Sequence, residues 1–192
     1  VHGFRTPFLD PPTGAPPQAF VDDDVTNTFS FRFDNGVSAH ALDVPADQLY
    51  LRVALFDEFT DGDDDLDLFL FYCPNGDDCS QVAQSGNFTS DEEINLLFPE
   101  PGRYVALVHG FQTDEVTGGP DASSSFFTWS LGATDVVGNL SVTAPQAVTM
   151  GERTQMQLEW SGLSSGQHYF GGISHNTPEG LYAITLVNVR TP

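Results

Sequence analysis

The fold class is decided by one alternating stretch, Leu66-Asp67-Leu68-Phe69-Leu70-Phe71-Tyr72. Residues two positions apart point to the same face of a strand, so the three leucines and Tyr72 share one apolar face. Phe69 and Phe71 make the second face apolar as well. Because a strand that is apolar on both faces is usually covered on both sides, we expect it to lie inside a layered β structure.

The period of two continues through most of the chain, and no stretch of eleven or more residues carries a helical stripe. The sequence therefore predicts an all-β protein, with an antiparallel, jelly-roll-like β-sandwich followed by a small second β-sheet subdomain. The expected strands cover residues 29–33, 49–55, 66–72, 94–98, 104–108, 126–131, 140–144, 156–160, 169–173 and 182–189.

Three parts are expected along the chain. Residues 1–24 contain two Pro-Pro pairs and read as a Pro-rich linker or an extended arm. Residues 25–133 form the jelly-roll-like β-sandwich. Residues 134–192 form the small C-terminal β subdomain, which has little core of its own, so we expect it to be packed on the first.

The charge of the chain is unusual. Twenty-seven Asp and Glu residues face six Arg and no Lys, which gives a formal net charge of −21. Such a surface repels nucleic acid and anionic lipid, so we expect neither nucleic acid nor membrane as a partner, and it attracts divalent cations. A solvated acidic surface accounts for most of these carboxylates. No apolar run reaches membrane-spanning length.

Two cysteines, Cys73 and Cys79, flank a short turn sequence. The turn brings their Cα atoms close enough for a disulfide, and a disulfide indicates an oxidising compartment, so we expect a secreted, extracellular protein. No further Cys and no His lies close in sequence, which argues against zinc. No signal peptide is visible, so we interpret the chain as a mature fragment or a piece of a larger precursor.

The run from Asp57 to Asp67 places seven carboxylates in eleven residues. Loops dense in Asp, with a Gly for curvature, supply the oxygen ligands that Ca²⁺ prefers. The run is not an EF-hand, because Leu66 stands where that loop needs Gly and Tyr72 where it needs Glu. The alternative is a solvated acidic turn that binds ions loosely. The sequence predicts Ca²⁺ as the cofactor, bound by Asp57, Asp61, Asp63, Asp65 and Asp67.

Catalytic residues are not expected. Five histidines are present, and a set such as His109, Asp114 and Ser123 can be nominated for acyl transfer. Nothing around these residues looks like a nucleophile elbow or another strained catalytic turn. The chain is therefore interpreted as a protein that is not an enzyme.

Several blocks occur in an order that resembles the C-terminal region of secreted bacterial subtilisin-like serine peptidases. They are Leu51–Glu58, Asp65–Phe71, Pro101–Phe111, Gly138–Pro145 and Trp160–Leu163. The Asp-Leu-Asp-Leu core of the strand is also similar to the pre-peptidase C-terminal domain, a β-sandwich of many secreted peptidases.

The resemblance implies a jelly-roll-like module appended to a peptidase, often calcium-binding, that aids stability, secretion or substrate attachment. Its expected partner is the parent peptidase domain or the substrate of that peptidase. The peptidase's own Asp-Thr-Gly, His-Gly-Thr-His and Gly-Thr-Ser-Met-Ala motifs are absent from the sequence. The resemblance therefore implies the tail without the enzyme.

Two other functions stay open. The Pro-rich arm can add a strand to the open sheet edge of a neighbour, which favours a homo-oligomer, such as a self-assembling subunit of a filament or surface layer. Alternatively, Trp129, Trp160 and Tyr169 form an aromatic platform of a lectin-like sandwich that binds carbohydrate or protein. At strand spacing, core packing is the commoner fate of such aromatic residues.

Overall fold

The computed structural model describes residues 1–10, 17–21, 29, 36–61, 64–76, 78–113, 121–145, 147–149 and 151–192. Its regular elements are strands, apart from one 3-10 turn, η1 (Asp57–Phe59), which confirms the all-β prediction. Among these residues there is no helix with the length and apolar character needed to cross a bilayer. The chain forms two compact units: a large unit, Phe8–Ser130, and a small unit, Val1–Pro7 with Leu131–Pro192.

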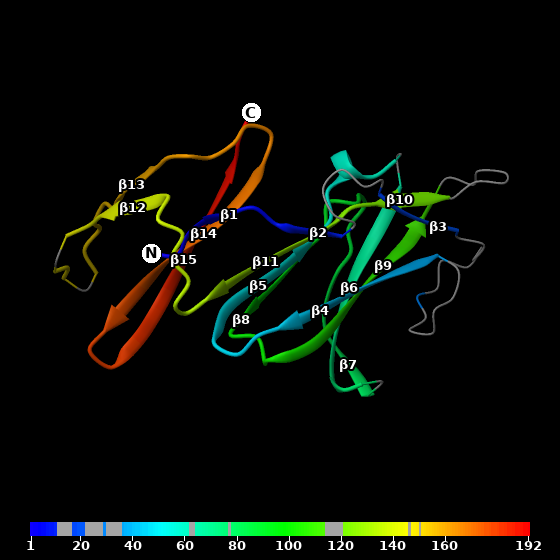
Figure 1. Cartoon of the computed structure of the whole chain (residues 1–192), viewed down its shortest axis with the longest axis horizontal. Helices are drawn as coiled ribbons and strands as arrows, with labels where there is room; N and C mark the ends of the chain where they lie inside the picture. Colours follow the sequence, from blue (N-terminus) through cyan, green and yellow to red (C-terminus); the bar gives the residue numbers. More distant parts are fainter. Residues whose placement is uncertain are drawn as a thin grey trace. The chain divides into compact units, whose positions relative to one another are not determined.

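The large unit contains two four-stranded sheets (Figure 1). The first has the order β2 (Phe8–Asp10), β11 (Phe126–Gly132), β5 (Gln48–Ala54), β8 (Glu93–Leu97), and the second has the order β4 (Val37–Val44), β9 (Gly102–Gln112), β6 (Asp65–Asn75), β7 (Asp78–Ser85). A short ladder joins β3 (Gln18–Phe20) to β10 (Ala122–Ser124). The registers of β4, β6, β7 and β9 in the second sheet are antiparallel.

The main core lies between these sheets, as the predicted β-sandwich requires. The leucines at positions 66, 68 and 70 of β6 are fully buried and share one hydrophobic cluster with Leu51, Val53 and Leu55 from β5 and its end. The opposite face of β6 is covered too, since the Phe29 ring stacks on the Phe69 ring with centroids 3.9 Å apart. Burial of both faces explains the doubly apolar pattern of β6.

Strands β4 and β7 were not predicted from the sequence. Both are edge strands of the second sheet. The sequence of β7, Asp-Cys-Ser-Gln-Val-Ala-Gln-Ser, is mostly polar, as edge strands that face solvent often are. Of the strand expected at residues 29–33, all but Phe29 lie outside the described residues.

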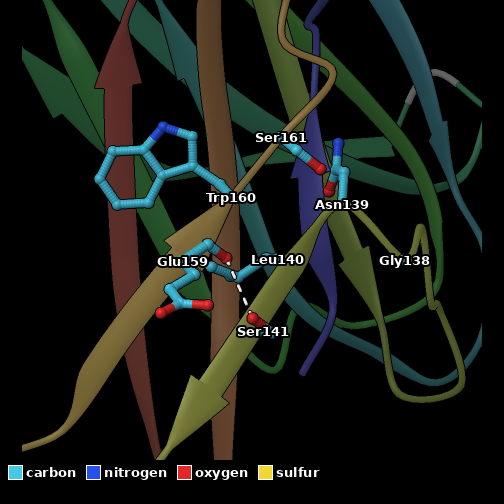
Figure 2. A pocket seen from close by; sticks show the side chains of 7 residues that line it. All are labelled: Gly138, Asn139, Leu140, Ser141, Glu159, Trp160 and Ser161. Atoms are coloured by element: carbon cyan, nitrogen blue, oxygen red, sulfur yellow. Dashed lines mark hydrogen bonds between the residues drawn. The ribbon is translucent and has the colours of Figure 1, made fainter.

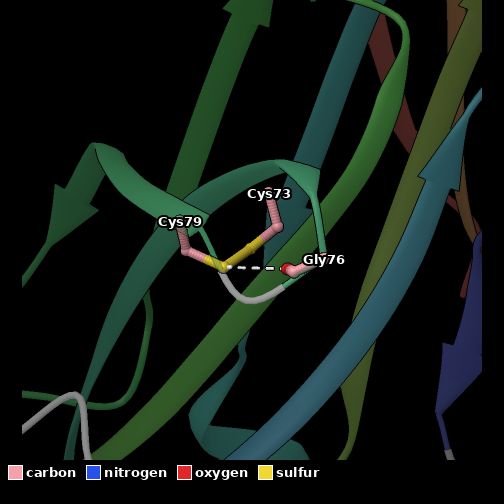
Figure 3. Close-up of a disulfide and its surroundings, with 3 residues drawn as sticks. All are labelled: Cys73, Gly76 and Cys79. Atoms are coloured by element: carbon pink, nitrogen blue, oxygen red, sulfur yellow. Dashed lines mark hydrogen bonds between the residues drawn. A yellow bond between two sulfur atoms is a disulfide. The ribbon is translucent and has the colours of Figure 1, made fainter.

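The predicted disulfide is confirmed. Cys73 at the end of β6 bonds to Cys79 in β7, with Cα atoms 4.1 Å apart (Figure 3). Gly76 lies in the turn between them with a φ of +75°, a left-handed conformation that glycine adopts without steric cost. The crosslink therefore ties an edge strand to the central strand of its sheet.

The small unit has its own β structure. A three-stranded sheet has the order β1 (Gly3–Arg5), β14 (His168–Thr177), β15 (Gly180–Arg190), and a hairpin pairs β12 (Leu140–Thr143) with β13 (Gln157–Trp160). Its buried cluster consists of Phe4, Leu140, Tyr169 and Ile173. This core is much smaller than that of the large unit.

The segment predicted to be a linker or an extended arm contributes three short strands. β1 pairs with β14, β2 with β11 and β3 with β10, and each pair is antiparallel. β1 belongs to the small unit, whereas β2 and β3 belong to the large unit. Residues 1–20 thus supply strands to three different sheets of the same chain.

Candidate functional site

The acidic loop leaves the end of β5, passes through η1 and enters β6. Asp57 accepts a hydrogen bond from the Ser90 amide on Oδ1, at 2.6 Å. Asp61 accepts one from the Ser123 amide, at 2.7 Å. Asp63 lies outside the described residues. The first two predicted ligands therefore hold neighbouring segments in place through one carboxylate oxygen each.

A second acidic turn, residues 86–92 between β7 and β8, meets this loop. Ser90 is fully buried, and its hydroxyl donates to the Asp64 carbonyl at 2.7 Å and accepts from the Leu66 amide at 3.1 Å. The Asp57 amide donates to the Asp91 carboxylate at 3.0 Å. The antiparallel pairing of β5 with β8 brings the end of one strand beside the start of the other, so the two acidic loops meet there.

Glu92 is a buried carboxylate of the second turn and is not among the site residues predicted from the sequence. It is 1% exposed. One of its oxygens accepts from the Asn87 amide at 2.8 Å, and the other accepts from the Ser85 hydroxyl. Burial raises the pKa of Glu92, and the carboxylates of Asp67 and Asp65 raise this pKa further.

Asp65, the first residue of β6, is 9% exposed. Within the part of the chain that the structure describes, its Oδ1 atom is buried without a hydrogen-bond partner. Burial raises the pKa of Asp65, and the neighbouring charges of Asp67 and Asp57 raise it further. A buried carboxylate with a free oxygen beside other carboxylates is unfavourable unless a proton or a cation compensates it.

Asp67 follows on the same face of β6. Its Oδ2 atom lies 3.9 Å from Nδ1 of His109, its cross-strand partner in β9, and His109 is 4% exposed. Its Oδ1 atom lies where Gly86 leaves room, because a Cβ added at Gly86 would be 2.5 Å from that oxygen. The Asp67 carboxylate thus lies between two neighbours. Gly86 of the second turn is next to its Oδ1 atom, and the buried His109 is next to its Oδ2 atom.

The chemistry of this cluster fits a hard divalent cation. Carboxylate and backbone oxygens are the ligands of Ca²⁺, and a cation removes the repulsion among Asp65, Asp67 and Glu92. Among the described residues, however, no three or more His, Cys, Asp or Glu side chains are arranged to hold a metal. A metal site here would need a further ligand from Asp63, which lies outside the described residues. The calcium site and its ligands stay a prediction.

The residues nominated for catalysis have other surroundings. His109 is buried against Asp67, and its ring meets the Phe29 ring edge-on at 5.6 Å. The Ser123 amide binds Asp61. Asp114 lies outside the described residues. The buried position of His109 explains it as a structural residue, and the absence of catalysis stays a prediction.

The three residues of the predicted aromatic platform differ in exposure, and the platform stays a prediction. Trp129 and Tyr169 are 5% and 8% exposed, because both pack within their units, and a buried ring offers no face to a sugar. Trp160 is 49% exposed and lies beside a pocket of about 230 Å³ (Figure 2). The pocket is lined by Gly138, Asn139, Leu140, Ser141, Glu159, Trp160 and Ser161.

Comparison with known proteins gives one similarity. Over 60 residues, 31% of this chain, the sequence is 38% identical to pyrolysin of Pyrococcus furiosus, and the match covers 4% of pyrolysin. No known family model matches the chain, and no solved structure matches it significantly. The similarity supports the resemblance to a peptidase-associated region and does not extend to a pre-peptidase C-terminal domain.

Proposed function

We propose that this chain is a non-catalytic, calcium-binding accessory module of a secreted subtilisin-like peptidase. The observation that carries the proposal is Asp65, a buried carboxylate with an unpartnered oxygen between two acidic loops. A structural feature of this kind costs stability unless a bound cation supplies the missing interaction. Ca²⁺ is the cation proposed, since it accepts six to eight oxygen ligands in flexible geometry.

Within the proposal, Asp65 and Asp67 supply carboxylate oxygens from β6. Asp57 and Asp61 each have one oxygen that the described hydrogen bonds do not use, and Asp63 completes the predicted set. Bound Ca²⁺ would join the loop that precedes β6 to the first residues of β6. Its role is to stabilise the β-sandwich, because a ligand that binds only the folded state raises the free energy of unfolding.

The accessory role is supported by sequence similarity. The 60-residue match is to pyrolysin, a subtilisin-like protease, and the longer resemblance is to regions that follow such peptidase domains. The Cys73–Cys79 disulfide is compatible with extracellular function. The proposed partner is the parent peptidase domain or its substrate, and the contribution of the module is stability, secretion or substrate attachment.

The experiment that tests the proposal is thermal unfolding after removal of metal ions. We expect millimolar Ca²⁺ to raise the Tm by several degrees, and an equal concentration of Mg²⁺ to raise it less, because Mg²⁺ demands a stricter octahedral site. Asp65→Asn should lose the response, whereas Asp43→Asn, on an exposed position of β4, should keep it. An unchanged Tm in Ca²⁺ would reject the metal site.

Absence of catalysis is tested separately. The purified chain should neither degrade casein nor react with a fluorophosphonate probe that labels active serine hydrolases, with or without Ca²⁺. Labelling of Ser123 would show that the chain is an enzyme. A calcium response without labelling would support both parts of the proposal.

A further inference from the structure

The N-terminal strand β1 is held in a slot of the small unit. Its register on β14 pairs Gly3 with Gly172, Phe4 with Gly171 and Arg5 with Phe170. The His2 amide adds a hydrogen bond to the Gly172 carbonyl at 2.8 Å. A strand of three residues therefore adds to the edge of a strand about 165 positions later in sequence.

The second edge of β1 is occupied by a side chain. Asn139 accepts a hydrogen bond from the Phe4 amide on Oδ1 at 2.7 Å and donates one from Nδ2 to the Phe4 carbonyl at 2.9 Å. Figure 2 shows Asn139 beside this strand. The amide of Asn139 thus takes the place of a neighbouring strand on one edge of β1, and β14 lies along the other edge.

The shape of the slot requires glycine. A Cβ added at Gly171 would lie 2.6 Å from the Gly3 carbonyl oxygen, so any other residue there would push β1 away. Gly3 has a φ of +69°, and a Cβ on it would lie 2.8 Å from the Val137 Cβ. Both the segment and its slot are therefore built for close backbone approach.

Side chains anchor the segment in the slot. Phe4 is 1% exposed in the small hydrophobic cluster, and its ring meets the Trp160 ring edge-on with centroids 5.9 Å apart. Arg5 forms an ion pair with Asp135 at 3.1 Å. The His2 ring contacts the Ser174 hydroxyl and the Asp135 carbonyl. These contacts resemble those of an extended peptide bound by strand addition.

Charge is divided unequally between the two units. Four of the 27 carboxylates and three of the six arginines belong to the small unit, so its formal charge is −1 and that of the large unit is −20. Residues 1–7 contain Arg5 and no carboxylate. The segment therefore carries a charge opposite in sign to that of the rest of the chain, and the slot offers Asp135 as the partner of Arg5.

We propose that this slot is a strand-acceptor site for residues 1–5 of a second copy of this chain. Every contact described above is made by residues 1–5 with residues 135–174, so exchange between copies preserves each contact. The segment of one copy enters the slot of the next, and repetition joins copies head to tail. This assembly is independent of calcium binding by the large unit.

Two complementary variants test the exchange. Phe4→Ser removes the anchor of the segment and leaves the slot open, while Gly171→Val closes the slot and leaves the segment free. In a chelator-containing buffer, light scattering coupled to size exclusion should find each variant alone to be a monomer of 20.8 kDa. The equimolar mixture should give a species of twice that mass, since only one pairing is possible. A mixture that stays monomeric at high concentration would overturn the exchange.

A peptide assay keeps the test decisive if Gly171→Val fails to fold. A fluorescent, acetylated peptide of residues 1–7 should bind the Phe4→Ser variant, detected as increased anisotropy. The same peptide with Gly3→Ala should bind at least tenfold more weakly, because its φ is unfavourable for any other residue. No binding to folded Phe4→Ser would overturn the acceptor site. Binding of the peptide without formation of a mixed dimer would restrict the segment to its own chain and reject the exchange.

Discussion

Asp65 contributes a buried negative charge that the described residues do not compensate. We expect Asp65→Asn to stabilise the metal-free protein at pH 7.5 by about 1–3 kcal/mol, because the neutral amide lacks the charge that burial and the Asp67 and Asp57 carboxylates disfavour. The measurement is urea denaturation in the presence of chelator. Asp43→Asn makes the same change of charge at an exposed site and should change stability by less than about 0.5 kcal/mol. Destabilisation by Asp65→Asn would show that the carboxylate is already satisfied.

Glu92 makes the stability of the metal-free protein depend on pH. Because burial raises its pKa in the folded state, the folded protein holds this proton at a pH where the unfolded chain has lost it. The stability contributed by Glu92 is therefore lost as the pH rises from the ordinary glutamate pKa through the raised pKa. Glu92→Gln should remove that part of the decline, which begins above the ordinary glutamate pKa of about 4.3.

His40 gives the opposite pH dependence of stability, so its effect has to be distinguished from that of Glu92. It is 1% exposed, and burial lowers its pKa, although its hydrogen bond to Asp10 partly opposes the shift. Its contribution to stability is therefore lost as the pH falls below about 6.5, where the unfolded histidine takes up a proton. The comparison of wild type with Glu92→Gln at each pH cancels this effect. Identical pH profiles would contradict the assigned role of Glu92.

At the scale of the elements, the turn between β7 and β8 fixes the position of Asp67. We expect Gly86→Ala to displace the Asp67 carboxylate, because the added Cβ would lie 2.5 Å from its oxygen, and to weaken calcium affinity about tenfold. Calcium titration followed by Tm is the measurement. Gly76→Ala is the matched control: it strains a left-handed turn residue but meets no atom within 4 Å. Equal affinity in both variants would exclude Asp67 as a ligand.

The elements also show what the sequence could predict. The central strands β5 and β6 were predicted because large apolar residues recur at every second position of their sequences. β7 was missed because its exposed positions are mostly polar, and β4 was missed because polar residues, Ser38 and His40, stand at its buried positions. Glu92 was missed because an acidic residue before a strand is usually solvated, whereas here Ser85 and Asn87 bind its buried carboxylate. Likewise, the sequence pattern of Trp129 does not distinguish a binding face from a core face.

At the scale of the whole chain, two units of different charge have different proposed roles. The large unit carries a formal charge of −20 and the acidic loops, and the small unit carries −1 and the slot for β1. We expect divalent cations to bind the large unit, and a second copy of the chain to bind the small unit. The segment predicted as an arm from its proline content contributes strands to both units.

The proposed calcium site is tested by calcium binding measured with titration calorimetry. The titration is run at a series of pH values above the ordinary carboxylate pKa, in two buffers of different ionisation enthalpy. We predict a saturable site in the wild type and release of protons, because Ca²⁺ displaces protons held by carboxylates whose pKa is raised. Asp65→Asn should abolish both. A calcium site at Asp65 is excluded if millimolar Ca²⁺ gives no saturable heat, or if Asp65→Asn binds Ca²⁺ as the wild type does.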